Sequence, residues 1–495
     1  MQLKRKYAQK FPLSLLILFF CLQVRVCTAE DNQLSTLVDR ALKSWKVPGA
    51  AVAIVHRDKL LYLAGHGLKH LDEVDKFTPD TLFPLASCTK AFTTTAMAML
   101  VEKGKMKWDD PVRKHVKFFR LSDPIADRLV TLRDLVSHRT GIGGHDYLWY
   151  HSPWKPEEVI RRIGKVKPDF PIRARFKYQT TMFTTAGFAV ASASGQSWES
   201  FIQERIFKPL GMKSSSCSTA KLDSVKDRAT GHVPNARGAL VPQKKWYPLR
   251  EPDAAGSINS TARDLVPWIR FQLSQGGQLL KETHTPQMVI RLGEHERRLH
   301  PDTVQMSYGM AWVIQDYRGH KLVSHAGAID GFKAHITLVP KSQLGMVILA
   351  NRHQTRMNLA LSYTLVDHIL GLKKKRDWNR ALLKVMEQKR QASKGAIQKR
   401  IKERQFGTKP SRPLLAFVGE YEHPAYGVCR IMLKKGQLYW RWSTFSERLV
   451  HFHFDTFVVE NEVMGRVELS FSKDRDGRVT GCHVSKPLNV RFTRP

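Results

Sequence analysis

The sequence predicts an α+β protein: an antiparallel sheet flanked by helices, with a large and mostly helical insertion, followed by a small C-terminal all-β domain. Strand-like segments rich in Val, Leu and Ile stand at 49–68 and again at 308–351, on either side of a long region with helical periodicity. One antiparallel sheet can be assembled in this way from both ends of a domain. Short segments of alternating hydrophobicity after residue 413 predict the second domain, a curved sheet or barrel.

The first 29 residues are typical of a cleavable signal peptide. Four of the first ten residues are basic, an apolar run follows at 11–24, and the small residues of 27–29 offer a cleavage site. The apolar run is shorter than the roughly 20 residues that a membrane-spanning helix needs, and an uncleaved anchor is the alternative. We therefore expect a periplasmic or secreted protein whose mature chain has no transmembrane segment.

The strongly basic composition bears on possible partners. The chain has 80 Lys and Arg against 44 Asp and Glu, a formal net charge of +36, and removing 1–29 with its five basic residues leaves +31. In the cytoplasm such a charge would suggest nucleic acid. We expect no nucleic-acid partner, because no recognised motif accompanies the charge and the signal peptide directs the chain to export. Anionic cell-envelope polymers and lipid headgroups are the partners that remain, unless the charge merely reflects a generally basic proteome or compartment.

Composition divides the mature chain into three parts. We expect a main domain at 30–372, a basic helical linker at 373–412 and the β domain at 413–495. The linker has 15 Lys or Arg against three acidic residues, a net charge of +12, and its apolar residues keep a helical spacing. A solvated spacer is the favoured interpretation of this charge, and a ligand-binding segment is the alternative.

Cysteine usage gives no sign of a metal site. The mature chain keeps Cys88, Cys217, Cys429 and Cys482, too few for a disulfide scaffold and without the spacing of zinc ligands. We therefore expect neither a metal nor another cofactor. Cys429 and Cys482 both stand in strand-like segments, and whether they form a disulfide is left open.

A serine nucleophile is indicated at Ser87. The pattern Ser-x-x-Lys occurs four times in the chain, but only Ser87 opens a helix, where residues three apart share one face. Serine is also a common N-cap, which is the simpler explanation. Lys90 argues against it, because the positive end of the helix dipole disfavours a cation in the first turn. Burial and the helix end would instead push this amine toward the neutral form that can act as a base.

Two further segments could complete a hydrolytic site. The segment 176–183 supplies Tyr178, placed before an apolar helical run, and the segment 323–332 supplies His325, followed by small residues that allow close approach of a ligand. Each residue also has a plain structural explanation, since a lone tyrosine is usually part of a core and a histidine at a strand end is usually an edge residue.

Taken together, these motifs resemble the serine beta-lactamase and penicillin-binding-protein superfamily, in the branch of class C beta-lactamases and related esterases and peptidases. The first family motif matches Ser87–Lys90, the second matches Tyr178–Thr180, and the third matches His325–Gly327. The resemblance covers about 34–371 and implies a beta-lactamase/transpeptidase-like fold. The C-terminal part is similar to a β domain appended to many relatives.

The resemblance implies acyl transfer to a catalytic serine. Ser87 would attack a carbonyl with Lys90 as its base, and Tyr178 would carry the proton to the leaving group and activate water for deacylation. Which group is the base is disputed even for well-studied relatives. The backbone N–H groups of Ser87 and Ala328 would form the oxyanion hole.

The substrate-binding positions that the resemblance implies are Thr180, His325, Gly327 and Ala328. Two of them depart from the family pattern. Thr180 replaces the usual asparagine and offers a shorter side chain with one donor. His325 replaces the lysine of many penicillin-recognising enzymes and would be fully charged only below about pH 6.5. Both changes weaken the case for efficient antibiotic hydrolysis.

We therefore expect an exported serine hydrolase that acts through a Ser-Lys-Tyr acyl-enzyme mechanism on a small-molecule or peptide amide or ester, of beta-lactamase, D,D-peptidase or esterase type. The alternative is a weak or inactive penicillin-binding-like module that holds envelope polymer, since a fold alone does not imply a function.

Overall fold

The computed structural model describes residues 29–495 except 221, 236–237, 244, 250–252, 276 and 374–375. Nearly all of the predicted signal peptide, 1–28, lies outside the described residues. Within them, no helix is long and apolar enough to cross a lipid bilayer.

An eight-stranded antiparallel sheet forms the centre of the main domain, in the order β2-β1-β12-β11-β10-β9-β8-β7. The N-terminal strand β1 pairs with β12, with Ala50 opposite Ala350, which confirms that the sheet is assembled from both ends of the domain. The strands are β1 (Gly49–His56), β2 (Lys59–Gly67), β7 (Met288–Val289), β8 (Met306–Tyr308), β9 (Val313–Tyr317), β10 (His320–Ile329), β11 (Phe332–Val339) and β12 (Leu344–Ala350).

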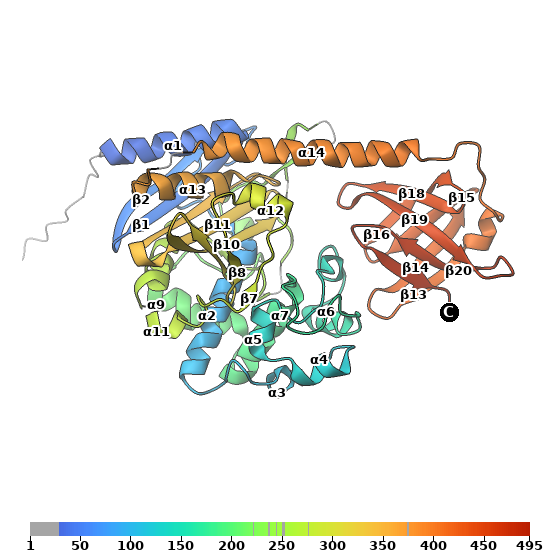
Figure 1. Ribbon diagram of the computed structural model, residues 1–495, viewed down its shortest axis with the longest axis horizontal. Helices are drawn as coiled ribbons and strands as arrows, with labels where there is room; N and C mark the ends of the chain where they lie inside the picture. Colours follow the sequence, from blue (N-terminus) through green and yellow to red (C-terminus); the bar gives the residue numbers. More distant parts are fainter. Residues whose placement is uncertain are drawn as a thin grey trace, which may run out of the picture.

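Both faces of this sheet are covered, which explains the unbroken apolar run of β1. Alternate residues of a strand point to opposite faces. Ala51 and Ala53 belong to the core shared with the helical insertion, whereas Val52 and Ile54 belong to the core under the terminal helices. Those terminal helices lie along one face of the sheet in Figure 1: α1 (Ala29–Trp45), α13 (Met357–Ile369) and the first part of α14 (Trp378–Lys402).

The insertion covers the opposite face of the sheet (Figure 1), and its segments include Ser87, Lys90 and Tyr178. It begins after β2 with β3 (Phe83–Pro84), the 3-10 turn η1 (Ala86–Cys88) and the long helix α2 (Thr89–Glu102). Its other elements are α3 (Val112–His115), α4 (Pro124–Leu129), α5 (Leu132–Val136), η2 (Asp146–Leu148), α6 (Pro156–Ile163), α7 (Thr180–Ser194), α8 (Trp198–Ile202), α9 (Lys208–Leu210), η4 (Leu222–Ser224), β4 (His232–Pro234), β5 (Leu240–Pro242), β6 (Asn259–Ser260), α10 (Leu265–Arg270) and α11 (Gly277–Leu280). The π-helical turns η3 (Gln203–Phe207) and η5 (Phe271–Gln275) follow α8 and α10, and α12 (Glu294–Leu299) stands between β7 and β8.

The C-terminal domain is one nine-stranded antiparallel sheet, in the order β16-β15-β14-β13-β21-β20-β19-β18-β17. Strands β16 and β18 also approach each other, so the sheet nearly closes into a barrel, in agreement with the predicted curved sheet. The 3-10 turn η7 (Leu414–Phe417) precedes the strands, which are β13 (Gly419–His423), β14 (Gly427–Lys434), β15 (Gln437–Trp442), β16 (Phe445–Arg448), β17 (Val450–His453), β18 (Thr456–Asn461), β19 (Gly465–Lys473), β20 (Val479–Val484) and β21 (Val490–Thr493). Cys429 and Cys482 are both buried free thiols.

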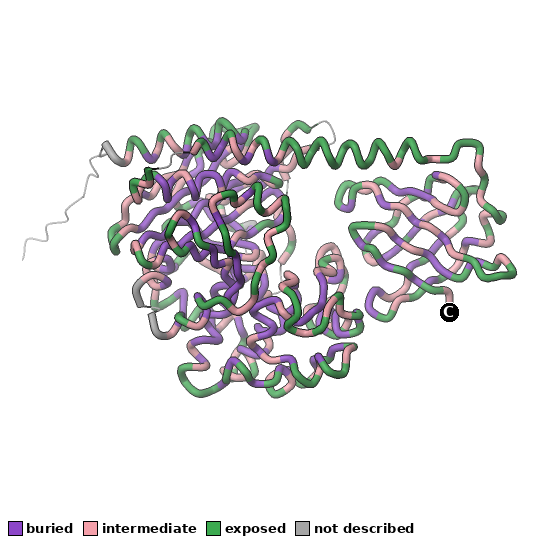
Figure 2. Tube along the Cα trace, in the orientation of Figure 1, coloured by how far each residue is buried: buried purple, intermediate pink, exposed green. Residues whose placement is uncertain are grey.

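Helix α14 joins the two domains. Its first turns are anchored in the main domain, where Trp378 Nε1 donates to Asp367 at 2.8 Å. Its later turns are exposed along their length (Figure 2). Near its end, Arg400 forms an ion pair of 2.7 Å with Glu468 of β19. The helix has 25 residues, so it spans about 37 Å at 1.5 Å per residue.

The β domain also touches the insertion directly. Tyr426 Oη and His145 Nδ1 share a hydrogen bond of 2.7 Å, and Thr444 Oγ1 donates to the His151 carbonyl at 2.5 Å. Arg162 of α6 donates to the carbonyl of Ala425 at 3.0 Å. The stretch 145–162 of the insertion therefore contacts the β domain. We call 145–154 the bridging loop.

Candidate active site

Ser87 lies in η1, at the entry to α2, and is half-buried. Ser87 is not the N-cap residue of either helix: the N-cap of η1 is Leu85 and that of α2 is Cys88, and neither makes a side-chain cap hydrogen bond. Ala86, directly before it, has φ of +47°, a left-handed conformation that non-glycine residues rarely adopt. Such backbone strain clusters at functional sites, where the surrounding packing must hold it.

Lys90 is fully buried one helical turn further on. Its Nζ lies 3.0 Å from Ser87 Oγ and 2.8 Å from the carbonyl oxygen of Ala255. Burial lowers the pKa of Lys90 to about 8, although the negative charges of Asp253 and Asp146 act in the opposite direction. A neutral amine is thus accessible near physiological pH, in contact with the hydroxyl it would deprotonate.

Tyr178 reaches the same point from the loop before α7. Its ring centroid lies 5.2 Å from Lys90 Nζ, and its hydroxyl is hydrogen-bonded to Ser87. Burial raises the pKa of Tyr178 well above its usual range, and the bond to Ser87 offsets this only in part. The phenol therefore keeps its proton and can pass it on, whereas Lys90 is the group suited to act as base.

His138 is a residue that the sequence analysis missed. It is buried, its ring packs 4.1 Å from that of Tyr178, and its Nδ1 accepts a hydrogen bond of 3.1 Å from the backbone N–H of Gln179. Gln179 in turn caps α7 by accepting from Thr181 N at 3.0 Å. Burial lowers the pKa of His138, so its ring is neutral. His138 thereby holds the backbone next to Tyr178. The only sign of it in the sequence was its position next to the end of a predicted helix.

His325 is buried in β10, and it is not among the residues that line the cavity beside Ser87. Its Nε2 shares a hydrogen bond of 3.0 Å with Tyr308 Oη. Burial lowers the pKa of His325 to about 3, with the Lys90 charge acting in the same direction. The expectation that this ring becomes charged near pH 6.5 is therefore wrong, because that value applies to an imidazole in water.

Gly327 explains why small residues follow His325. A Cβ at this position would collide with the Leu85 carbonyl oxygen and would lie 3.3 Å from Cys88 N. Only glycine allows β10 to approach the turn that carries Ser87 so closely. The family position thus has a packing role in this chain.

A cavity of about 190 Å³ opens beside Ser87. Thr180, the first residue of α7, lines it together with Tyr178 and Ala328. The structure therefore brings Ser87, Lys90, Tyr178, Thr180 and Ala328 to one place. The oxyanion hole formed by the N–H groups of Ser87 and Ala328 stays a prediction.

Asp253 also lines this cavity and is a second residue that sequence reasoning missed. Its carboxylate accepts from Ala255 N at 2.7 Å and from Thr184 Oγ1 at 3.1 Å. It thereby shapes the turn whose Ala255 carbonyl holds Lys90. Burial raises its pKa, partly offset by these hydrogen bonds. No spacing pattern pointed to it, because it acts from a loop.

Ser470 shows how the other Ser-x-x-Lys patterns differ. Its Oγ is bonded to Thr456 at 3.1 Å within the β domain, and Lys473 pairs with Asp455 at 2.8 Å. Serine and lysine here serve separate partners. No group of three or more His, Cys, Asp or Glu side chains among the described residues could hold a metal ion.

The chain belongs to the beta-lactamase family, whose model matches residues 34–369. This confirms the resemblance drawn from Ser87–Lys90 and its partners. A second family model, a domain of unknown function termed DUF3471, matches 403–494.

Known relatives include hydrolases. The chain is 29% identical over 429 residues to an unguisins hydrolase of Aspergillus campestris, covering 80% of this chain and 76% of that protein. It is 26% identical over 351 residues to protein flp of Staphylococcus aureus, covering 70% and 67%.

Solved structures agree in fold. A penicillin-binding protein homologue from Pyrococcus abyssi superposes with a TM-score of 0.61 at 20% identity, covering 94% of this chain and 99% of that one. The D-amino acid amidase of Ochrobactrum anthropi gives a TM-score of 0.59 at 22% identity, covering 70% and 98%. The chain is thus a beta-lactamase-family protein with an appended β domain.

Proposed function

We propose that the chain is a serine hydrolase that cleaves an amide or ester through an acyl-enzyme on Ser87. The observation that carries the proposal is the buried Lys90 amine, with a pKa lowered to about 8 by burial and 3.0 Å from the Oγ of Ser87, which lines a cavity. A lysine buried against a serine hydroxyl has little structural use and a clear chemical one.

The reaction has two halves. Lys90 takes the hydroxyl proton as Ser87 Oγ bonds to the carbonyl carbon. Tyr178 delivers its proton to the leaving amine or alcohol as the scissile bond breaks, and Lys90 passes the serine proton on to Tyr178. Water then attacks the acyl ester and loses a proton to Lys90, and this proton returns to Ser87 Oγ as the ester bond breaks and the carboxylic acid is released.

The amide class is favoured by the name of one structural neighbour, a D-amino acid amidase, and a sequence relative is named as a hydrolase of unguisins. The neutral ring of His325 agrees with this choice, because it supplies no positive charge for the carboxylate that many penicillin-type substrates carry. Beta-lactam hydrolysis is therefore expected to be the weakest of the activities.

Intact-mass analysis after treatment with a fluorophosphonate, a penicillin and short activated esters tests the proposal. Wild type and Ser470→Ala, a matched control with the same Ser-x-x-Lys pattern, should gain one adduct, and Ser87→Ala should gain none. An adduct that persists in Ser87→Ala would overturn the assignment. An adduct without turnover of any ester or amide would favour a binding module.

We also propose that the protein acts outside the cytoplasm, in the periplasm or medium. The support is the segment 1–29 alone, with its basic start and apolar run. N-terminal sequencing of the exported protein should begin near residue 30, and a full-length cytosolic protein would refute it.

A further inference from the structure

The cavity beside Ser87 is acidic in an otherwise basic protein. Asp146 and Asp253 both line it, and none of its described lining residues is Lys, Arg or His. The whole chain carries a formal charge of +36. The local sign is therefore the reverse of the overall one, and a low-dielectric cleft focuses the field of such charges on a ligand.

Asp146 is the carboxylate available to a ligand. It stands in η2 on the bridging loop and is exposed. Its Oδ1 accepts a hydrogen bond of 2.9 Å from Trp149 Nε1, which holds the carboxylate in place. Its negative charge acts on both Lys90 and Tyr178, so it lies within electrostatic reach of the catalytic groups.

Asp253 adds a carboxylate to the cavity, but its oxygens are used in hydrogen bonds within the protein. Its oxygens are engaged by Thr184 and by the backbone of Ala255, and burial raises its pKa. A third carboxylate, Asp330, follows the lining residue Ile329 and accepts a hydrogen bond of 2.5 Å from Tyr150. The single cationic group among the catalytic residues is Lys90, and the carboxylates near the cavity are those of Asp146, Asp253 and Asp330.

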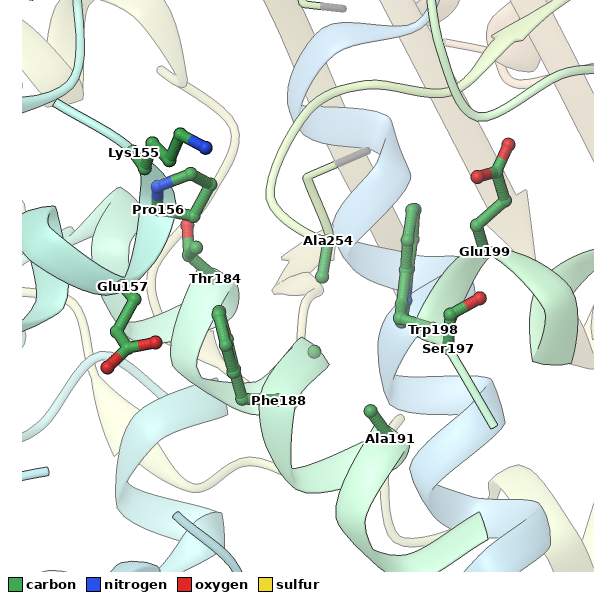
Figure 3. Close-up of a pocket in the computed structure, with 11 residues that line it drawn as sticks. Lys155, Pro156, Glu157, Thr184, Phe188, Ala191, Ser197, Trp198, Glu199 and Ala254 are labelled. Carbon is green, nitrogen blue, oxygen red and sulfur yellow. The ribbon is translucent and has the colours of Figure 1, made fainter. Parts of the chain in front are cut away.

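The wall beyond Asp146 is aromatic and continues into larger space. Trp149, Leu249 and Asp253 line both the 190 Å³ cavity and a neighbouring one of about 330 Å³. Thr184 lines the second cavity and a third of about 450 Å³, around which Figure 3 shows Phe188, Trp198 and Ala254. A cation held by Asp146 would thus lie close to Trp149, whose Nε1 already donates to the same carboxylate.

We infer that the acyl substrate carries a positively charged amino group close to the scissile carbonyl, and that Asp146 binds this group. The inference rests on the proposed function and adds the substrate class: an aminoacyl or peptidyl compound with a free amine. A charge-assisted hydrogen bond between ammonium and carboxylate provides the selectivity, and the hydrogen bond from Trp149 positions that carboxylate. A substrate carboxylate at the same place would meet Asp146 with a like charge.

Matched substrate pairs test this inference. The kcat/KM of aminoacyl p-nitroanilides with a free α-amine is compared with that of the same compounds after N-acetylation. Wild type should prefer the free amine by about tenfold or more, mainly through KM. Asp146→Asn keeps the acceptor for Trp149 and should lose most of that ratio. Asp58→Asn removes the same charge from an exposed turn and should keep it.

The outcomes separate the two proposals. Equal rates for both members of the pairs in wild type, or an unchanged ratio in Asp146→Asn, would overturn the inference while fluorophosphonate labelling of Ser87 still succeeds. Absence of labelling and of p-nitrophenyl acetate hydrolysis in wild type would overturn the proposed function, and this inference with it. A charge reversal, Asp146→Lys, should shift the preference toward N-succinyl substrates.

Discussion

The protonation of Lys90 is predicted to set the pH dependence of catalysis. Burial lowers the pKa of this amine from 10.5 to about 8. At pH 7.5 roughly a quarter of the molecules would then hold a neutral amine, against roughly one in a thousand for a lysine in water. We therefore expect kcat/KM to rise about tenfold per pH unit below pH 7 and to level off above pH 8.

The perturbation is Lys90→Arg, because arginine stays charged at every working pH and cannot serve as a base. A loss of about 100-fold or more in kcat/KM is expected, the usual contribution of a positioned base. The assay is hydrolysis of a neutral p-nitrophenyl ester, followed at the isosbestic wavelength of nitrophenol. Lys103→Arg, at the exposed end of the same helix, is the control and should keep wild-type activity.

Two results would refute this reasoning: a wild-type profile that is flat from pH 6 to pH 9, or a Lys90→Arg variant that keeps half of the activity. Because arginine is larger than the buried site it enters, Lys90→Met separates folding from chemistry. Lys90→Met should unfold cooperatively, as wild type does, and should be as inactive as Lys90→Arg.

Three further outcomes are expected. Lys90→Met should be more stable than wild type by up to about 3 kcal/mol at pH 6, because burying a charged lysine destabilises the folded state of wild type. This difference should disappear above pH 10.5, where Lys90 is neutral in both the folded and the unfolded chain. Denaturant unfolding at both pH values measures it. Gly327→Ala should lower the free energy of unfolding by about 1–3 kcal/mol and slow Ser87 acylation, because its methyl group meets the Leu85 carbonyl; calorimetry and labelling rates measure both effects. Tyr426→Phe should remove about 1 kcal/mol of stability and raise KM more than it lowers kcat, because it frees His145 on the bridging loop; unchanged kinetics beside a lower midpoint would show a purely structural bond.

The sequence predicted those parts of the site that lie in a short motif or beside a segment with helical periodicity. Ser87 and Lys90 share a helix face at a spacing of three residues, and Tyr178 precedes the apolar run that becomes α7. Alternating hydrophobicity and apolar runs are local signals, so the strands at both ends of the main domain could be predicted. The prediction that they form one sheet followed from these two sets of strands.

The other features of the site depend on contacts between residues that are far apart in the sequence, and the sequence does not reveal these contacts. Asp253, Asp146 and His138 reach the site from loops and helix ends, where no periodicity constrains the residue type. The state of His325 was also beyond the sequence, because a pKa follows from burial and neighbours, which only the packed structure defines.

The bridging loop connects the β domain to the residues that would select the substrate. It carries Asp146 and Trp149 into the cavity, and the β domain contacts its His145 and His151, whereas Ser87 and the buried Lys90 belong to the main domain alone. Chemistry and selectivity are thereby encoded in separable parts of the chain. If Asp146 binds the substrate as proposed, substitutions on the rim of the β domain, or its replacement by another such domain, are expected to change which acyl group is accepted and to leave the nucleophile untouched.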